Sequence, residues 1–290
     1  MWIFILSIHP TAIVDSTARI GSGVHIGPFC IVEKNAVLGD DCHLASRAIV
    51  KEQTELGPGN TLHEDAVLGG LPQHSHLPEK MGKLKIGEGN TFRENTTVHR
   101  GLNDEQATQI GDHNLVMVGV HIGHDCLIGN HTVLINNVML AGHVTVEDRA
   151  YVAGGAAVQQ FRRVGRLAAV GGYSRAVKDV PPFVMLDGNT SGVVGLNRVG
   201  LQRAGYQAED IAGLKNAYRL IYRSGLAWNE ILSRLKSDFT SGPAAEFYPF
   251  FADGKYGFMP ERRSPNSATL RLYRADGRVS DEDGVQAKAG

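Results

Sequence analysis

The feature that most constrains this chain is an aliphatic residue that returns at every sixth position. One run begins at Ile8 and ends at Leu68, and a second begins at Ile110 and ends at Val170. A period of six fits neither an α-helix nor a long strand, but it fits a short strand followed by a tight corner. We therefore predict a mainly β fold, a parallel β-helix of hexapeptide repeats. Three repeats close one triangular coil, and the aliphatic side chains point inward.

The position four residues after each aliphatic residue is usually small. Cys30, Cys42 and Cys126 occupy this position, and they are the 3 cysteines of the chain. We predict that they pack in the core, because a reactive thiol requires an exposed, electropositive setting. So few cysteines also argue against a disulfide framework and fit a reducing compartment.

Two interruptions break the period, at Leu71–Lys85 and at about Gly101–Gln109. The first contains Gln73, His74 and His76, and the second is polar. Insertions in a solenoid become loops that project from one face, which is often the binding face.

The repeat fades after Val177, and Pro181–Pro182 is predicted to mark a boundary. Apolar residues then recur at helical spacing, which predicts helices through Ile211–Ile221, Trp228–Phe239 and Gly242–Phe251. We predict a β-helix over 1–190, a C-terminal helical domain over 191–261 and a disordered tail over 262–290.

Charge and hydropathy exclude several classes of protein. Lys+Arg is 29 and Asp+Glu is 30, for a net charge of -1, which excludes a broadly basic nucleic-acid binder. No apolar run approaches the roughly 20 residues of a membrane span. Met1–Leu6 is apolar but short, and it lacks the basic flank of a signal peptide. We therefore expect a cytoplasmic protein with no membrane span.

One group of polar residues stands out among the 12 histidines. A β-helix filled with aliphatic side chains has no interior pocket, so chemistry must lie on its outside, where neighbouring subunits can enclose a site. His121, His124 and Asp125 lie within five residues, Gly142–His143 follows one coil later, and Gln160 follows one coil after that. The period predicts that positions 124, 142 and 160 stack along one edge of the triangle.

These residue types suit acyl transfer to a hydroxyl. Histidine titrates near neutral pH and serves as a general base, and Asp125 can orient the ring of His124. The Gly142 N–H can stabilise a developing oxyanion. Serine and cysteine nucleophiles are missing from this group, so direct transfer is the natural mechanism. Most other outward histidines are expected to be solvated, namely His9, His25, His43, His63, His113 and His131.

Two alternatives remain open at this point. His121, His124 and His143 could bind zinc between subunits, as in gamma-class carbonic anhydrases. That chemistry does not need the helical segment, and Asp125 is placed to serve a base instead. The chain could also be a scaffold without catalysis.

Over residues 8–262 the chain resembles the UDP-N-acetylglucosamine O-acyltransferases, the first enzymes of lipid A synthesis. Hexapeptide repeats alone are weakly specific, whereas the blocks HIGHD, GLNRVGLQRAG and NAYRLIYRSG are strongly specific. The segments that carry the resemblance are 99–101, 121–125, 140–144, 159–161, 179–184, 188–205 and 216–225.

The resemblance implies a homotrimer of left-handed β-helices with sites between subunits. It implies transfer of a (3-hydroxy)acyl chain from acyl carrier protein to the 3-hydroxyl of UDP-N-acetylglucosamine. His124 would be the general base, Asp125 its orienting partner and Gly142 the oxyanion donor. No metal and no cofactor are expected beyond the phosphopantetheine of acyl carrier protein.

The resemblance also implies a set of substrate-binding residues. His121, His143 and Gln160 would position the sugar or the donor, and Gly154 would contact the pantetheine arm. Contacts to the nucleotide or donor would come from Asn197 and Arg203, since a guanidinium pairs well with a diphosphate. A basic patch for acyl carrier protein could be formed by Arg198, Arg203, Lys215, Arg219 and Arg223.

The first loop departs from the family pattern, which is commonly Gln-Asp-x-Lys. Here Gln73 and His76 take the first and last positions, and His74 replaces the acid. We predict that Gln73 and His76 bind substrate. Gln159 also stands where the family often has histidine. These changes keep an alternative open, N-acylation of a UDP-3-amino-sugar by the same mechanism.

Overall fold

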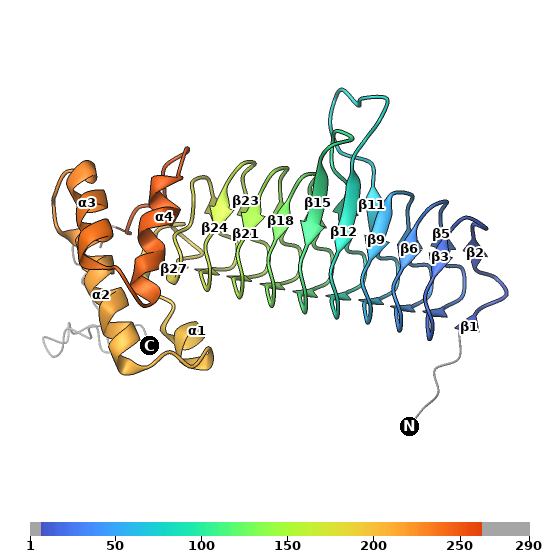
Figure 1. Cartoon of the computed structure of the whole chain (residues 1–290), viewed down its shortest axis with the longest axis horizontal. Coiled ribbons are helices and arrows are strands. Elements are labelled where there is room, and N and C mark those ends of the chain that lie inside the picture. Colours follow the sequence, from blue (N-terminus) through green and yellow to red (C-terminus); the bar gives the residue numbers. More distant parts are fainter. Residues whose placement is uncertain (1–6, 263–290) are drawn as a thin grey trace, which may run out of the picture.

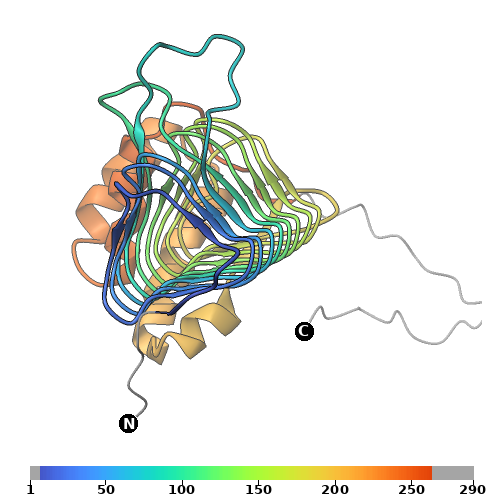
Figure 2. The same ribbon diagram turned by 90° about the vertical axis from the view of Figure 1, so that its right-hand side faces the viewer.

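The computed structural model describes residues 7–262, and up to Leu196 the chain winds as a triangular prism of short, mainly parallel strands (Figures 1 and 2). Each strand pairs with the strand one coil further on, as in the register Ser7↔His25 and Ile8↔Ile26. The prism has three walls, which are sheets of 11, 9 and 8 strands. The predicted tail, except for Arg262, lies outside the described residues.

We call the three walls sheets A, B and C. Sheet A contains β1 (Ser7–Ile8), β4 (His25–Ile26), β7 (His43–Leu44), β10 (Thr61–Leu62), β13 (Thr91–Phe92), β16 (Leu115–Val116), β19 (Val133–Leu134), β22 (Tyr151–Val152), β25 (Ala169–Val170), β27 (Val184–Leu186) and β28 (Val193–Leu196). Sheet B contains β2 (Ile13–Val14), β5 (Ile31–Val32), β8 (Ile49–Val50), β11 (Val67–Gly70), β14 (Thr97–His99), β17 (His121–Ile122), β20 (Met139–Leu140), β23 (Ala157–Val158) and β26 (Arg175–Ala176). Sheet C contains β3 (Arg19–Ile20), β6 (Val37–Leu38), β9 (Thr54–Leu56), β12 (Lys83–Ile86), β15 (Ala107–Ile110), β18 (Leu127–Ile128), β21 (Thr145–Val146) and β24 (Arg163–Val164).

The second residue of most strands points into the prism, as the period predicts. Ile26, Leu62 and Val152 are fully buried, and so are the three cysteines, which confirms their place in the core. Burial raises the pKa of the Cys126 thiol to about 12, so this side chain is unreactive at neutral pH. Ile8 is an exception, because it lies in the first coil of the described residues, and it is 43% exposed.

We name the edges of the prism after the sheets they join. At edge C–A, buried side chains form a ladder from coil to coil. The Asn60 Oδ1 accepts from the Asn90 side-chain amide at 2.9 Å, and the Asn90 Oδ1 accepts from Asn114 at 2.9 Å. The Asn114 Oδ1 accepts from the Thr132 hydroxyl at 2.7 Å. This ladder satisfies polar groups that would otherwise be buried without partners.

Edge B–C is the irregular edge. The loops 71–82 and 100–106 both leave sheet B and return to sheet C, so they project from the same edge (Figures 1 and 2). This confirms that the interruptions form loops on one face. The first loop is shorter than predicted, because Lys83–Lys85 is part of β12 and pairs with β9 and β15.

The helices pack on the last coils of the prism (Figure 1). They are α1 (Arg198–Arg203), α2 (Ala208–Arg223), α3 (Trp228–Asp238), η1 (Pro243–Glu246) and α4 (Phe247–Ala252). Arg163 donates to the Phe250 carbonyl at 2.6 Å, and Arg166 pairs with Glu246 at 2.6 Å.

The walls of the prism continue past the predicted boundary at Pro181–Pro182. Val180 forms a bridge with Val164, and the backbone then continues into β27 of sheet A. The prolines are buried in this last coil because they replace a corner rather than begin a linker. Sheet A ends only after β28, which pairs antiparallel with β27.

Candidate active site

Edge B–C stacks the predicted site positions from coil to coil. His124, Gly142 and Gln160 each lie in a corner between a strand of sheet B and a strand of sheet C. The His143 N–H donates to the His124 carbonyl at 2.9 Å, and the Phe161 N–H donates to the Gly142 carbonyl at 3.2 Å. The predicted alignment of these three corners is therefore confirmed.

His124 and Asp125 form a close pair in the first of these corners. The Nδ1 of His124 lies 2.7 Å from the Oδ2 of Asp125, and their side chains are 12% and 6% exposed. Asp125 has a φ of 59°, a left-handed corner conformation that aspartate tolerates better than most residues. This corner turns the carboxylate back toward the imidazole next to it.

The second loop holds the Asp125 carboxylate in place. The Leu102 N–H lies 3.2 Å from each carboxylate oxygen, and the Asp125 N–H donates to the Thr108 Oγ1 at 2.7 Å. Leu102 and Thr108 lie on either side of the turn of this loop. The insertion therefore fixes the partner of His124, which the sequence did not reveal.

Gly142 lies directly against the imidazole of His124. A Cβ at position 142 would be 2.8 Å from the Cε1 and Nε2 atoms of that ring, which is closer than real side chains approach. Glycine is therefore required for the ring to lie over the backbone. Within residues 7–262, the Gly142 N–H has no protein acceptor, so it is available to a ligand.

His143 completes the corner from the next coil. Its Nε2 lies 3.7 Å from the Oδ2 of Asp125, and its ring is perpendicular to that of His124, with centroids 5.1 Å apart. The other side of the His143 ring stacks on Phe161 at 4.6 Å. Burial lowers the pKa of His143, an effect that Asp125 partly opposes.

His121 lies on β17 and faces a different partner. Its ring lies 5.0 Å from that of His99, and its Nδ1 lies 3.1 Å from the Thr97 hydroxyl. The Nδ1 of His99 lies 2.6 Å from the Leu71 carbonyl. Burial lowers the pKa of both His99 and His121. The site predictions omitted His99, although it lies immediately before the second loop.

The first loop brings His74 over the site. The ring centroids of His74 and His124 are 6.0 Å apart, and the two rings are perpendicular. Gln73 and His76 are exposed on the same loop, and the ring of His76 lies 6.4 Å from that of His74. His74 was not among the predicted site residues. The sequence did offer a signal for it, because His74 lies in the first loop at the position where the family has an acid.

Comparison with known proteins identifies the family. Residues 179–259 match the family described as UDP-N-acetylglucosamine O-acyltransferase, domain 2, and residues 17–52 match the bacterial transferase hexapeptide family. An acyl-(acyl-carrier-protein)–UDP-N-acetylglucosamine O-acyltransferase from Burkholderia lata is 49% identical over 79% of this chain and 88% of its own length. The chain belongs to this acyltransferase family. A member from Synechocystis is 43% identical over 89% of this chain and 93% of its own length.

Solved structures support the same family and the left-handed β-helix. The UDP-N-acetylglucosamine acyltransferase of Francisella novicida is 32% identical with a TM-score of 0.84, and the match covers 89% of this chain and 95% of that one. The enzyme from Moraxella catarrhalis is 39% identical with a TM-score of 0.83, over 87% and 99% of the two chains. Within residues 7–262, none of the helices has the length and apolar character that a membrane span requires.

The remaining residues predicted for this acyltransferase lie on the other two edges. Gly154 lies in a corner between β22 and β23, at edge A–B. The Asn197 side chain donates to the Leu167 carbonyl at 2.8 Å, at edge C–A, and accepts from the Gly200 N–H at 3.0 Å as the cap of α1. Arg203 is exposed at the end of α1. A single chain therefore does not bring these residues to His124, and their predicted roles stay predictions.

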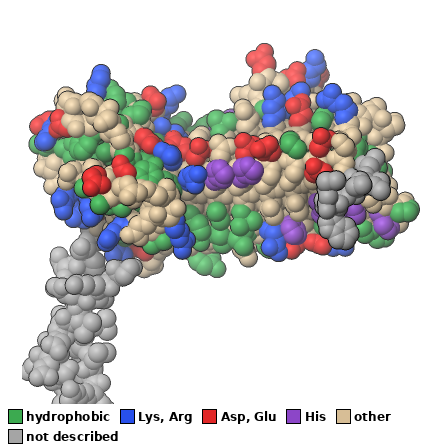
Figure 3. Space-filling model, turned by 60° about the horizontal axis from the view of Figure 1, so that its bottom comes forward, with side chains coloured by type: hydrophobic (Ala, Val, Ile, Leu, Met, Phe, Trp, Pro, Cys, Tyr) green, Lys and Arg blue, Asp and Glu red, His purple; other side chains and the backbone are tan. Residues whose placement is uncertain are grey.

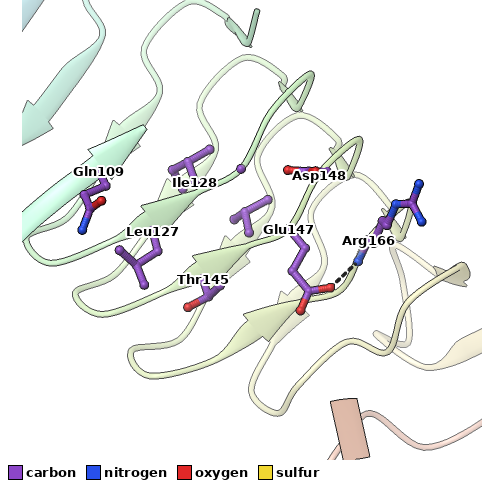
Figure 4. Close-up of a pocket in the computed structure, with 9 residues that line it drawn as sticks. Gln109, Leu127, Ile128, Thr145, Glu147, Asp148 and Arg166 are labelled. Atoms are coloured by element: carbon purple, nitrogen blue, oxygen red, sulfur yellow. Dashed lines mark hydrogen bonds between the residues drawn. The ribbon is translucent and has the colours of Figure 1, made fainter. Parts of the chain in front are cut away.

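A groove of about 450 Å³ lies on the outer face of sheet C (Figure 4). Its lining includes Leu127, Thr145 and Glu147, and a Glu147 oxygen accepts from the Arg166 N–H at 2.8 Å. Burial raises the pKa of Glu147. The groove contains no residue of the His124 corner, so we do not assign the reaction to it.

Proposed function

We propose that this protein transfers a (3-hydroxy)acyl chain from acyl carrier protein to the 3-hydroxyl of UDP-N-acetylglucosamine, the first step of lipid A biosynthesis. The names of the relatives support the donor and the acceptor. The observation that carries the chemistry is the buried pair of His124 and Asp125, 2.7 Å apart, beside the N–H of Gly142. The reaction takes place in the cytoplasm.

His124 acts as the general base in this mechanism. Its Nδ1–H donates to Asp125, so its Nε2 carries the lone pair that removes the proton of the sugar 3-hydroxyl. The hydroxyl oxygen then attacks the thioester carbon and forms a tetrahedral intermediate. When this intermediate collapses, the C–S bond breaks, and the thiolate of the phosphopantetheine takes the proton from His124.

Asp125 keeps His124 in the productive tautomer and stabilises its charged form. The Leu102 N–H holds the carboxylate from the opposite side, so the acid cannot turn away from the ring. Gly142 provides an N–H that stabilises the oxyanion, a contribution that is typically several kcal/mol in acyl transfer. His143 and Gln160 continue the same edge, and they position the sugar or the donor together with His121, Gln73 and His76.

The placement of the other predicted residues supports a homotrimer. Gly154 lies at edge A–B and Asn197 lies near edge C–A, while His124 lies at edge B–C. The three edges of one prism are separated by its walls, so these residues can share one site only when copies of the chain pack side by side. The outer face of sheet A supports such packing. It carries apolar side chains, including Tyr151 (43% exposed) and Met185 (39% exposed), and hydrophobic side chains gather near the middle of the view in Figure 3.

A second candidate is N-acylation of the 3-amino analogue of UDP-N-acetylglucosamine. His74 favours it, because this residue replaces the acid of the family pattern and its ring lies 6.0 Å from His124. An imidazole in place of the family's carboxylate removes a negative charge near the position expected for the 3-substituent of the sugar.

A transfer assay tests both candidates. Purified protein is given 3-hydroxyacyl carrier proteins of several chain lengths, with UDP-N-acetylglucosamine or its 3-amino analogue, and the products are identified by mass spectrometry. Faster ester formation supports the leading proposal, and faster amide formation replaces it with the second. No product with either acceptor from any donor would refute acyl transfer to a UDP-sugar.

A further inference from the structure

We propose that the His124 corner is also a binding site for a transition-metal ion such as Zn²⁺, and that the bound ion blocks the reaction. One ligand atom from each of His124, Asp125 and His143 lies within 4.8 Å of the others. Imidazole nitrogens and one carboxylate oxygen form a ligand set that zinc prefers. This ligand set differs from the zinc ligands considered from the sequence alone, which included His121 in place of Asp125.

The distances in this corner are close to those of a coordination site. The Oδ2 of Asp125 lies 2.7 Å from the His124 Nδ1 and 3.7 Å from the His143 Nε2. Zinc bonds of about 2.0–2.1 Å in a tetrahedron separate two ligand atoms by about 3.3 Å. The distance from Asp125 to His124 must therefore lengthen, and the distance from Asp125 to His143 must shorten, each by several tenths of an ångström. An ion would then take the place of the proton between His124 and Asp125.

We assign the fourth ligand to His74 of the first loop, which must move closer because it is not part of the group whose ligand atoms lie within 4.8 Å of one another. Its ring lies 6.0 Å from that of His124, and it is exposed at the tip of the insertion. Its Nδ1 lies 2.9 Å from the His76 carbonyl, which leaves its Nε2 available. Three imidazoles and one carboxylate would complete a tetrahedral set.

A second cluster shows why the His124 corner is the better site. His63, Glu64 and Glu94 also have ligand atoms within 4.8 Å of one another. Glu94, however, is paired through both oxygens with Arg93, at 2.9 and 3.0 Å. Within residues 7–262, Asp125 has no lysine or arginine partner, and its side chain is only 6% exposed. A buried carboxylate whose neighbours are histidines is better suited to a metal ion.

The expected loss of activity follows from which nitrogen of His124 binds the ion. A metal on the Nδ1 of His124 replaces the hydrogen bond that orients the base, and it also narrows the approach to the Nε2. Inhibition rests on the proposed function, whereas metal binding does not. The inhibitory ion would be zinc, cobalt or copper, because Mg²⁺ prefers oxygen ligands and keeps its water shell.

Metal binding is measured on the full chain without substrates. Equilibrium dialysis against buffered Zn²⁺ gives the stoichiometry and the Kd, and visible absorption of the Co²⁺ form reports tetrahedral geometry. The variants are His74→Asn and His143→Asn, and the matched control is His131→Asn, a histidine in a stacked pair at edge C–A. Circular dichroism and gel filtration show that each variant is folded.

We expect about one ion per chain, at least about tenfold weaker binding in His74→Asn and His143→Asn, and unchanged binding in His131→Asn. Less than one ion per chain, or equal binding by all three variants, would overturn the site. Zn²⁺ should also lower the transfer rate reversibly, with recovery on addition of a chelator and no effect of Mg²⁺. Binding without inhibition would overturn the blocking role. A chain that binds zinc as described but transfers no acyl group without metal contradicts only the proposed function.

Discussion

Two pairs of histidines, at different edges of the prism, show what distinguishes a site from a repeated surface feature. His113 and His131 lie at edge C–A with ring centroids 5.2 Å apart, and His124 and His143 lie at edge B–C with centroids 5.1 Å apart. Both pairs join neighbouring coils, but only His113 and His131 occupy equivalent positions of the period, because His124 is aligned with Gly142. The first pair is stacked at 21°, whereas the second is perpendicular at 86°.

The acid beside each pair makes the difference. His113 lies 3.6 Å from Glu88, but these two side chains are 50% and 56% exposed, so water screens their interaction. His124 lies 2.7 Å from Asp125, which is 6% exposed and is also held by the Leu102 N–H. Stacked coils bring imidazoles together at either edge, but an inserted loop is needed to bury and fix the carboxylate.

The largest expected effect is on the base itself. His124→Ala should lower the transfer rate by about 10²–10⁴-fold, because general-base catalysis contributes an acceleration of this size. His131→Ala, the equivalent change in the exposed pair, should leave the rate unchanged. Initial rates with saturating substrates measure both. Equal rates in the two variants would contradict the assignment of His124.

The next effect concerns the buried acid. Asp125→Asn keeps the shape of the side chain but removes the charge that holds the tautomer of His124, so the rate should fall by about 10²-fold. Glu88→Gln makes the same change beside the exposed pair and should have no effect on the rate. A loss of rate that is equally large in Glu88→Gln would show that Asp125 has no special role.

A third change should separate stability from activity. Asn114→Ala breaks the ladder at edge C–A and leaves the buried N–H and hydroxyl of Thr132 without their acceptor, which should cost about 1–3 kcal/mol in the free energy of unfolding. Urea unfolding at fixed protein concentration measures this loss. The transfer rate per folded molecule should stay the same. The His124→Ala variant should instead lose its transfer rate and keep its free energy of unfolding. A ladder variant that unfolds like the wild type would contradict the structural role of this edge.

The smallest effect is on the pH dependence of stability. Burial lowers the pKa of His99, His121 and His143 in the folded state. The unfolded chain, with histidine pKa values near 6.5, therefore binds more protons, and stability should fall as the pH drops below about 6.5. The melting temperature of His121→Asn should fall less steeply between about pH 7.5 and pH 5.5 than that of the wild type. A slope that changes equally in exposed His131→Asn would mean that burial is not the cause.

Prediction from the sequence was most successful where the chain repeats. The six-residue period identified the prism, the buried cysteines and the stacking of His124 below Gly142. Pro181–Pro182 was predicted as a boundary, and the coil continues through these prolines, which form one of its corners. His74 was missed because its position depends on a loop that has no period. His99 was missed although it lies on β14, one coil before His121 on β17.

The sequence by itself determined which side chains face inward and which corners align, because a fixed repeat turns spacing along the chain into position in space. Only the tertiary structure decided that Leu102 holds Asp125, that His74 lies over His124, and that His121 faces His99 instead. The first two contacts join a regular coil to irregular loops. The path of such a loop is set by the local hydrogen bonds and packing of one conformation, and no pattern in the sequence specifies them.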